Sequence, residues 1–186
     1  MREENKEFFH WVMPGVLNES SNNSYSETYA SLTVDYMLKK SREDKNFITV
    51  VAGTPGVFGF NSKIRKEFGK HYTDVGIAEE HAIAYCSALA KSGAKAVFNV
   101  MSSFVQRTYD QLSQDLCLNN SPATILVYWG GISGADCTHL CVFDIPLISN
   151  IPNIVYLAPT CKEEYLKMLD ANNFLPNRYF ESINKY

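Results

Sequence analysis

The chain has 186 residues, of which 46% are hydrophobic and 20% are charged, and this composition is typical of a globular domain with one well-filled core. Its formal net charge of -3, without a block of like charges, argues against binding to nucleic acid or to an anionic lipid surface. The amino terminus lacks the apolar stretch of a signal peptide, and no later run approaches the roughly 18 apolar residues of a membrane span. We therefore expect a cytoplasmic protein without a membrane anchor.

The cysteines point to the same compartment. There are five of them, Cys86, Cys117, Cys137, Cys141 and Cys161, and an odd number does not suit a closed set of disulfides. At least one lies within an apolar helical pattern. We expect free thiols in a reducing environment.

Residues 1–25 are polar and contain the run ESSNNS, so we interpret them as a lead-in that precedes the folded domain. From Ser26 the apolar residues recur at helical spacing, which predicts a first helix over 26–44. We expect the domain itself to occupy 26–180 and to be followed by a short tail over 181–186.

Short apolar runs rich in β-branched residues alternate with helical patterns along the rest of the chain. The runs predict buried strands at 46–53, 94–101, 123–129 and 153–159. The helical patterns cover 79–93, 104–118 and 162–172. This alternation predicts an α/β fold with three layers, in which helices cover both faces of a mainly parallel sheet of about six strands.

Ligands of such sheets bind at the carboxyl ends of the strands. The segments that follow the predicted strands are therefore candidates for a site, and the first of them is the loop GTPGVFGF at 53–60. Its glycines lack the spacing of a dinucleotide-binding or phosphate-binding loop, so they favour a structural turn.

Glu79 and Glu80 begin a mostly apolar helix. Acidic residues favour a helix amino terminus because they complement its dipole, and this explanation needs no ligand. Alternatively, one carboxylate points into a site, where partial burial would let it share a proton with a ligand nitrogen.

Phe104 and Arg107 follow the strand that ends at Met101. Taken alone, such an aromatic residue is more often part of a core, and such a cation more often lies on the surface. At the end of a sheet, the same pair can instead stack on a planar ring and bind an anion.

The sequence C-T-H-L-C places His139 between Cys137 and Cys141. Zinc sites usually complete such a set with a distant second pair of ligands, and the chain offers none, so we do not predict a metal site. Asp136 and His139 fit better as acid, base or hydrogen-bonding groups beside a polar substrate, although a structural role for the histidine stays open.

The order and spacing of four segments resemble the central domain of the 1-deoxy-D-xylulose-5-phosphate synthase family, which is related to transketolase. These segments are DVGIAEEHA (74–82), SSFVQRTYDQL (102–112), GADCTHLCVFD (134–144) and PNIVYLAPT (152–160). FHWVMP (9–14) is also similar to the segment that precedes that domain, so the resemblance runs from about residue 8 to about residue 180.

The resemblance implies thiamine diphosphate as the cofactor, bound between two domains, and the chain matches the domain that holds the pyrimidine ring. Glu79 then hydrogen-bonds a pyrimidine nitrogen, and Phe104 packs on the ring. Arg107 orders that wall or contacts the substrate, and Met101 stands where an aromatic residue is common. Asp136 and His139 match residues near the reacting carbon, where the family joins decarboxylated pyruvate to glyceraldehyde 3-phosphate in isoprenoid precursor synthesis.

The family's diphosphate domain, with its magnesium motif, has no counterpart here. We therefore expect a homodimer or a complex with a chain that carries the diphosphate domain, and no turnover by the isolated chain. One competing hypothesis is a non-catalytic pairing or regulatory module of the same fold, because the loop around Asp136 is one residue shorter than the family pattern. Another is a small flavodoxin-like binding protein.

Overall fold

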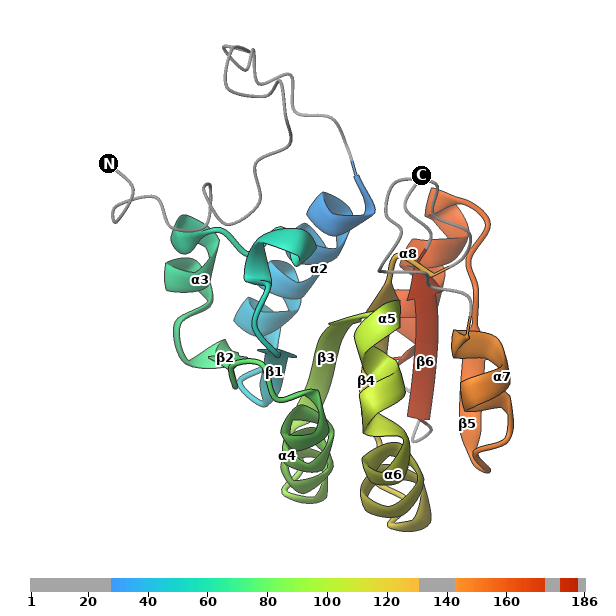
Figure 1. Cartoon of the computed structure of the whole chain (residues 1–186). Coiled ribbons are helices and arrows are strands. Elements are labelled where there is room, and N and C mark those ends of the chain that lie inside the picture. Colours follow the sequence, from blue (N-terminus) through green and yellow to red (C-terminus); the bar gives the residue numbers. More distant parts are fainter. Residues whose placement is uncertain (1–27, 131–142, 173–177, 184–186) are drawn as a thin grey trace, which may run out of the picture.

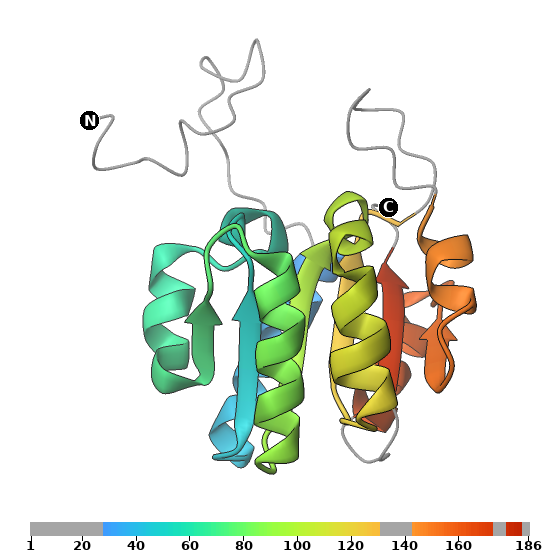
Figure 2. The ribbon, with the colours of Figure 1, turned by 60° about the horizontal axis from the view of Figure 1, so that its bottom comes forward.

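The computed structural model describes residues 28–130, 143–172 and 178–183. Within these ranges, helices lie on both faces of a central sheet, as Figure 1 and Figure 2 show from two directions. The three-layer arrangement predicted from the alternation of strands and helices is confirmed.

The sheet has six strands in the order β2-β1-β3-β4-β6-β5, and all neighbouring strands are parallel. The strands are β1 (Phe47–Val51), β2 (Tyr72–Asp74), β3 (Lys95–Met101), β4 (Thr124–Tyr128), β5 (Ile154–Leu157) and β6 (Arg178–Ile183). Since parallel strands all end at one edge, the segments that directly follow β1, β2 and β3 lie at that edge.

Two of the six strands carry no clear strand pattern in the sequence. β2 is an edge strand of only three residues, and its burial is incomplete. β6 is the last strand along the chain, yet it lies between β4 and β5 in the sheet (Figure 1). It continues to Ile183, beyond the domain boundary that we expected at residue 180.

The first described helix, α2 (Tyr29–Glu43), begins three residues later than the apolar pattern suggested. Its start is set by Thr28, whose side chain accepts a hydrogen bond from the backbone N–H of Ser31, while the Ser31 side chain accepts one from the backbone N–H of Thr28. This reciprocal pair satisfies two amide donors that a helix start would leave free. The helix buries Val34 and Met37 against the sheet.

The other longer helices are α3 (Ser62–Phe68), α4 (Glu79–Lys91), α7 (Asp144–Ser149) and α8 (Lys162–Asn172). Short 3-10 segments occur at η2 (Pro55–Phe58) and η3 (Gly69–His71). Among the helices of the described ranges, none combines the length and the apolar character needed to cross a bilayer.

The helix expected as one unit over 104–118 is instead a succession of short segments. These are α5 (Ser102–Val105), η4 (Gln106–Thr108), α6 (Tyr109–Gln111) and the π-helical segment η5 (Leu112–Leu118). Within η5 the carbonyl of Asp115 accepts a hydrogen bond from Oγ of Ser87 on α4, 2.6 Å away. A side chain that bonds to the helix backbone in this way accompanies the widened turn.

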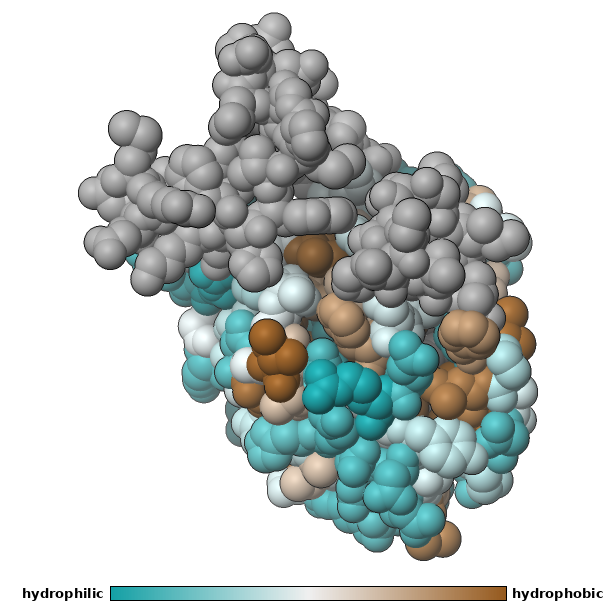
Figure 3. All heavy atoms as spheres, in the orientation of Figure 1, coloured by the Kyte–Doolittle hydropathy of each residue, from teal (hydrophilic) through white to brown (hydrophobic). Residues whose placement is uncertain are grey.

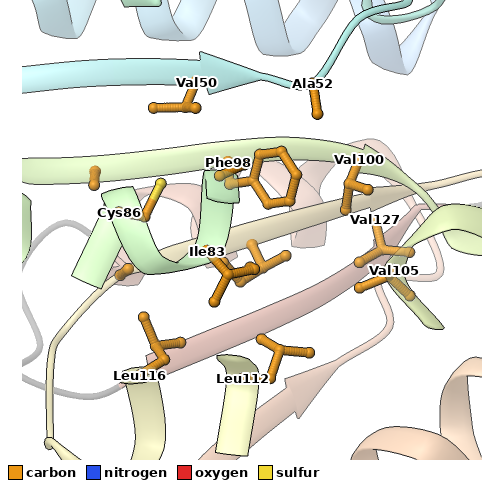
Figure 4. Packing of buried hydrophobic residues seen from close by; sticks show 14 of the residues in the cluster. Val50, Ala52, Ile83, Cys86, Phe98, Val100, Val105, Leu112, Leu116 and Val127 are labelled. Carbon is orange, nitrogen blue, oxygen red and sulfur yellow. The ribbon is translucent and has the colours of Figure 1, made fainter. Parts of the chain in front are cut away.

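Alternate residues of the strands face two separate apolar layers. On one face Val50, Phe98 and Val127 pack with Ile83 of α4 and Leu112 of η5 (Figure 4). These side chains are fully buried. Helices α4, α6 and α7 cover this face (Figure 2).

The opposite face is covered by α2 and α8. Phe47, Val51 and Leu126 of the strands pack there with Met37 of α2 and Tyr165 of α8. Oγ1 of Thr33, also on α2, makes a short buried hydrogen bond with Oη of Tyr165, which joins the two helices.

A buried polar group interrupts this second apolar layer. Nδ2 of Asn99 donates to Oγ1 of Thr49 at 2.8 Å and to the carbonyl of Val50 at 3.2 Å, and Oη of Tyr128 donates to Oδ1 of Asn99 at 3.2 Å. The group therefore links the side chains of three neighbouring strands, β1, β3 and β4. Because these polar atoms are hydrogen-bonded, their burial is not penalised as an unpaired group would be.

Candidate functional site

The loops after β1 and β2 are tied together at the carboxyl edge of the sheet. Oδ1 of Asp74, the last residue of β2, accepts hydrogen bonds from the backbone N–H groups of Gly53 at 3.0 Å and Gly76 at 2.9 Å. Gly53 has a φ of 64°, and a Cβ there would lie 3.1 Å from Cγ1 of Ile77. The glycine therefore permits a close approach that positions the chain just before Glu79.

Glu79 is the first residue of α4, and only 2% of its side chain is exposed. Its Oε2 atom is buried and has no hydrogen-bond partner among the described residues. A carboxylate that merely complemented a helix dipole would be free to remain in water, so the burial of Glu79 favours the interpretation as a ligand-facing group. The adjacent Glu80 is 38% exposed.

Arg107 lies in η4 and approaches both acids. Its Nη1 atom is 3.2 Å from Oε2 of Glu79, and its Nε atom is 3.3 Å from Oε1 of Glu80. The first distance is within ion-pair range, yet Oε2 of Glu79 is not hydrogen-bonded, which means that the donor N–H of Arg107 is not directed at it. With 48% of its side chain exposed, Arg107 forms the outer wall of this group.

Met101 and Phe104 lie on either side of the start of α5. Met101 is 4% exposed and belongs to the second apolar layer. Phe104 is half-buried and packs against both layers, so it lies at the end of the sheet where the two layers meet. This position is compatible with the predicted role of Phe104 as an aromatic wall, whereas a cofactor contact by Met101 stays a prediction.

Two serines that the sequence analysis did not single out belong to the same region. Oγ of Ser102 and Oγ of Ser103 are buried and have no hydrogen-bond partner among the described residues. Buried hydroxyls are normally paired, so these two atoms and Oε2 of Glu79 are capable of binding polar ligand atoms. The signal in the sequence was the Ser-Ser pair directly after a strand. The sequence alone does not distinguish such buried serines from exposed ones.

Trp129 directly follows β4 and lies at the carboxyl edge of the sheet. Its φ of 63° is in the left-handed region, where bulky residues are rare. Asp136 and His139, together with Cys137 and Cys141, lie outside the described residues. Their roles stay predictions.

Apolar side chains are also exposed near this edge. Ile77, two residues before Glu79, is 78% exposed. On the face seen in Figure 3, apolar groups lie among polar ones. An exposed apolar residue beside a buried carboxylate offers a surface for the face of a planar ring.

The cysteines within the described ranges are free thiols: Cys86 and Cys117 are buried, and Cys161 is exposed. Burial raises the pKa of Cys86 to about 12. In the part of the chain that the structure describes, no group of three or more His, Cys, Asp or Glu side chains is placed to hold a metal ion.

Comparison with known proteins decides the family. The family model for the transketolase pyrimidine binding domain matches residues 35–173, which include the acids at the start of α4 and the segments that follow β3. The chain belongs to this family.

Curated relatives of this pyrimidine-binding domain are 1-deoxy-D-xylulose-5-phosphate synthases. The one from Clostridium perfringens (strain SM101 / Type A) is 35% identical over 181 residues, which are 94% of this chain and 28% of the relative. The one from Symbiobacterium thermophilum is 39% identical over 144 residues, 77% of this chain and 22% of the relative. The chain thus spans about a quarter of the length of these relatives.

Solved transketolases share the fold of the pyrimidine-binding domain. The structure from Campylobacter jejuni superposes with a TM-score of 0.72 at 12% identity and covers 98% of this chain and 30% of that one. A split-gene transketolase, described as an inactive β4 tetramer, gives a TM-score of 0.70 at 15% identity and covers 82% of this chain and 49% of that one. At such identities these structures support the fold alone.

Proposed function

We propose that this domain holds the pyrimidine ring of thiamine diphosphate and supplies one half of a transferase site like that of 1-deoxy-D-xylulose-5-phosphate synthase. The substrates proposed are pyruvate and glyceraldehyde 3-phosphate, and the product would enter isoprenoid precursor synthesis. The observation that carries the proposal is the buried Oε2 atom of Glu79, which lies at the carboxyl edge of the sheet and has no hydrogen-bond partner among the described residues.

The residues around Glu79 fit a pyrimidine ring. A carboxylate held away from water can exchange a proton at little cost with a ring nitrogen of similar basicity. Phe104 is half-buried at the junction of the two apolar layers, where an aromatic face can pack on a ring. We assign Met101, which is buried in the second apolar layer, to the base of this wall. Arg107 lies at its outer side beside Glu79.

Thiamine diphosphate, when bound, would supply the carbanion stabilisation that two-carbon transfer requires. In this proposal the residues of the chain bind and orient the ring. Glu79 holds or moves a proton at the ring nitrogen, and the buried hydroxyls of Ser102 and Ser103 offer further polar contacts. Asp136 and His139 would contact the polar groups of the substrate.

The diphosphate and its magnesium ion are assigned to another domain, because the chain spans only 28% of the relative from Clostridium perfringens. That domain can belong to a longer form of this protein or to a partner chain, and the pyrimidine-binding domain can also pair with itself. The split-gene transketolase of similar fold was solved as an inactive β4 tetramer.

The proposal is tested by combining the chain with a chain that carries the diphosphate domain, such as the first domain of a bacterial relative. Turnover of pyruvate and glyceraldehyde 3-phosphate is then measured with magnesium and thiamine diphosphate. We expect activity in the mixture and its loss on Glu79→Gln, while Glu67→Gln, which removes an exposed ion pair with Arg42, leaves it unchanged. Cofactor binding without turnover would favour the regulatory module, and full activity of Glu79→Gln would remove that residue from the mechanism.

A further inference from the structure

Arg107 is held between two acids that differ in burial. Its guanidinium lies 3.2 Å from Oε2 of the buried Glu79 and 3.3 Å from Oε1 of the half-exposed Glu80. Neither contact has the geometry of a hydrogen bond, since the N–H groups of Arg107 are not directed at the two carboxylates. Oε2 of Glu79 therefore has no hydrogen-bond partner among the described residues. The position of the guanidinium therefore reflects two competing attractions.

The position of Arg107 decides whether Oε2 of Glu79 is accessible to a ligand. An arginine beside a single buried carboxylate ordinarily turns to form charge-assisted, often bidentate, hydrogen bonds with it. Such bonds would occupy Oε2 of Glu79, the atom that the proposed function leaves for the ligand. A ligand nitrogen would then have to displace Arg107 before it could bind.

We propose that Glu80 is a positioning residue, which draws the guanidinium of Arg107 outward and so keeps Oε2 of Glu79 free for a ligand. This inference rests on the proposed function of Glu79. Glu80 acts on Glu79 only through the guanidinium of Arg107, which lies between the two carboxylates. In this proposal Glu80 itself touches neither the ring nor the substrate. Loss of that charge lets Arg107 close onto Glu79.

The first test concerns geometry alone and needs no ligand. In the full chain labelled with ¹⁵N-arginine, we compare the guanidinium proton signals of Arg107 in the wild type and in Glu80→Gln by NMR. We expect slower solvent exchange and a shifted Nη–H signal in Glu80→Gln, because Arg107 then donates to the buried carboxylate. Glu80→Asp keeps the charge and should preserve the wild-type signals. Identical signals in the wild type and Glu80→Gln would overturn the inference.

The second test uses thiamine diphosphate with magnesium as the probe, added to the full chain combined with a chain that carries the diphosphate domain, and calorimetry as the readout. In Glu80→Gln the cofactor must first break the contact between Arg107 and Glu79, which is a partly exposed ion pair. We therefore expect binding to be weakened about three- to tenfold in this variant. Glu80→Asp should restore most of it, and Glu67→Gln serves as the matched control without an effect.

The variants separate the two proposals. If Glu79→Gln binds as tightly as the wild type, the proposed function itself fails. If Glu79→Gln loses binding while Glu80→Gln binds like the wild type, the proposed function stands and the role of Glu80 is refuted.

Discussion

Oε2 of Glu79 lies 3.2 Å from Nη1 of Arg107, so a carboxylate that is 2% exposed faces the cation of a half-exposed arginine. A buried charge without a nearby opposite charge is costly, and Arg107 provides that charge across the gap between α4 and η4. The pair therefore contributes to the fold as well as to the candidate site.

The first prediction follows from this pair. Replacement Arg107→Gln leaves Glu79 without a compensating cation, and we expect the free energy of unfolding to fall by about 1–3 kcal/mol. Chemical denaturation measures the loss. The matched control is Arg42→Gln, which breaks the exposed pair with Glu67 and should cost less than about 1 kcal/mol.

A double variant completes this prediction. In Glu79→Gln with Arg107→Gln the buried charge is absent, so the added cost of losing Arg107 should shrink. Equal costs of Arg107→Gln in the presence and absence of the Glu79 charge would show that the two side chains are not coupled.

The second prediction concerns the buried polar group of Asn99. Replacement Asn99→Leu removes two donated hydrogen bonds and leaves Oγ1 of Thr49 short of a donor, so we expect a loss of about 2 kcal/mol in denaturation experiments. Asn119→Leu provides the control, since the amide of Asn119 is exposed and bonds only to the carbonyl of Gln114 among the described partners. A loss for Asn99→Leu no larger than the control would contradict the assignment.

The third prediction concerns pH. The backbone N–H of Asn46, and then the Lys95 ammonium, hold the pKa of Asp44 below its ordinary value. Because the folded state has the lower pKa, this stabilisation is complete above the unfolded value of about 3.9 and is lost as pH falls through the folded value. Asp44→Asn should therefore be less stable than the wild type by about 0.5–1 kcal/mol at neutral pH.

The pH series of the same two proteins provides the check. We expect the difference in unfolding free energy between the wild type and Asp44→Asn to vanish in acid. A difference that stays constant from neutral to acid pH would rule out the ionised form of Asp44 as its source.

The fourth prediction concerns the thiols. Burial raises the pKa of Cys86 to about 12, and the residue is fully buried, so its reactive thiolate is scarce and shielded. At about pH 8, iodoacetamide should modify the exposed Cys161 in the native protein and Cys86 only after unfolding. Peptide mass spectrometry distinguishes the sites, and rapid native modification of Cys86 would be inconsistent with its place in the core.

Much of the fold was predictable because burial leaves a pattern in the sequence. The central strands β1, β3 and β4 are runs of apolar residues that face helices on both sides, so they stand out. β2 is short and partly exposed, and β6 carries charged residues, so neither leaves that pattern. The π-helical turn of η5 coincides with a hydrogen bond from Ser87, a contact from another helix that periodicity does not register.

The candidate site was predictable in part. The position of Glu79 after a strand and at the start of a helix indicated a residue at the ligand edge, and the resemblance to a known family gave it a role. Periodicity alone did not show which of the two acids, Glu79 or Glu80, is buried. Either of two adjacent residues at the start of a helix can face the sheet. The approach of Arg107 to both acids depends on the 3-10 turn of η4, which has no clear signal in the sequence.

The most direct test of the central claim is an NMR titration with thiamine diphosphate and magnesium of the labelled full chain, combined with an unlabelled chain that carries the diphosphate domain. The titration is followed at the backbone amides of Glu79 and Phe104. We predict saturable shifts of both signals in the wild type and an affinity at least about tenfold lower in Glu79→Gln, because a hydrogen bond from a buried carboxylate is lost. Equal affinities of the two proteins, or shifts confined to residues far from the carboxyl edge of the sheet, would contradict the claim.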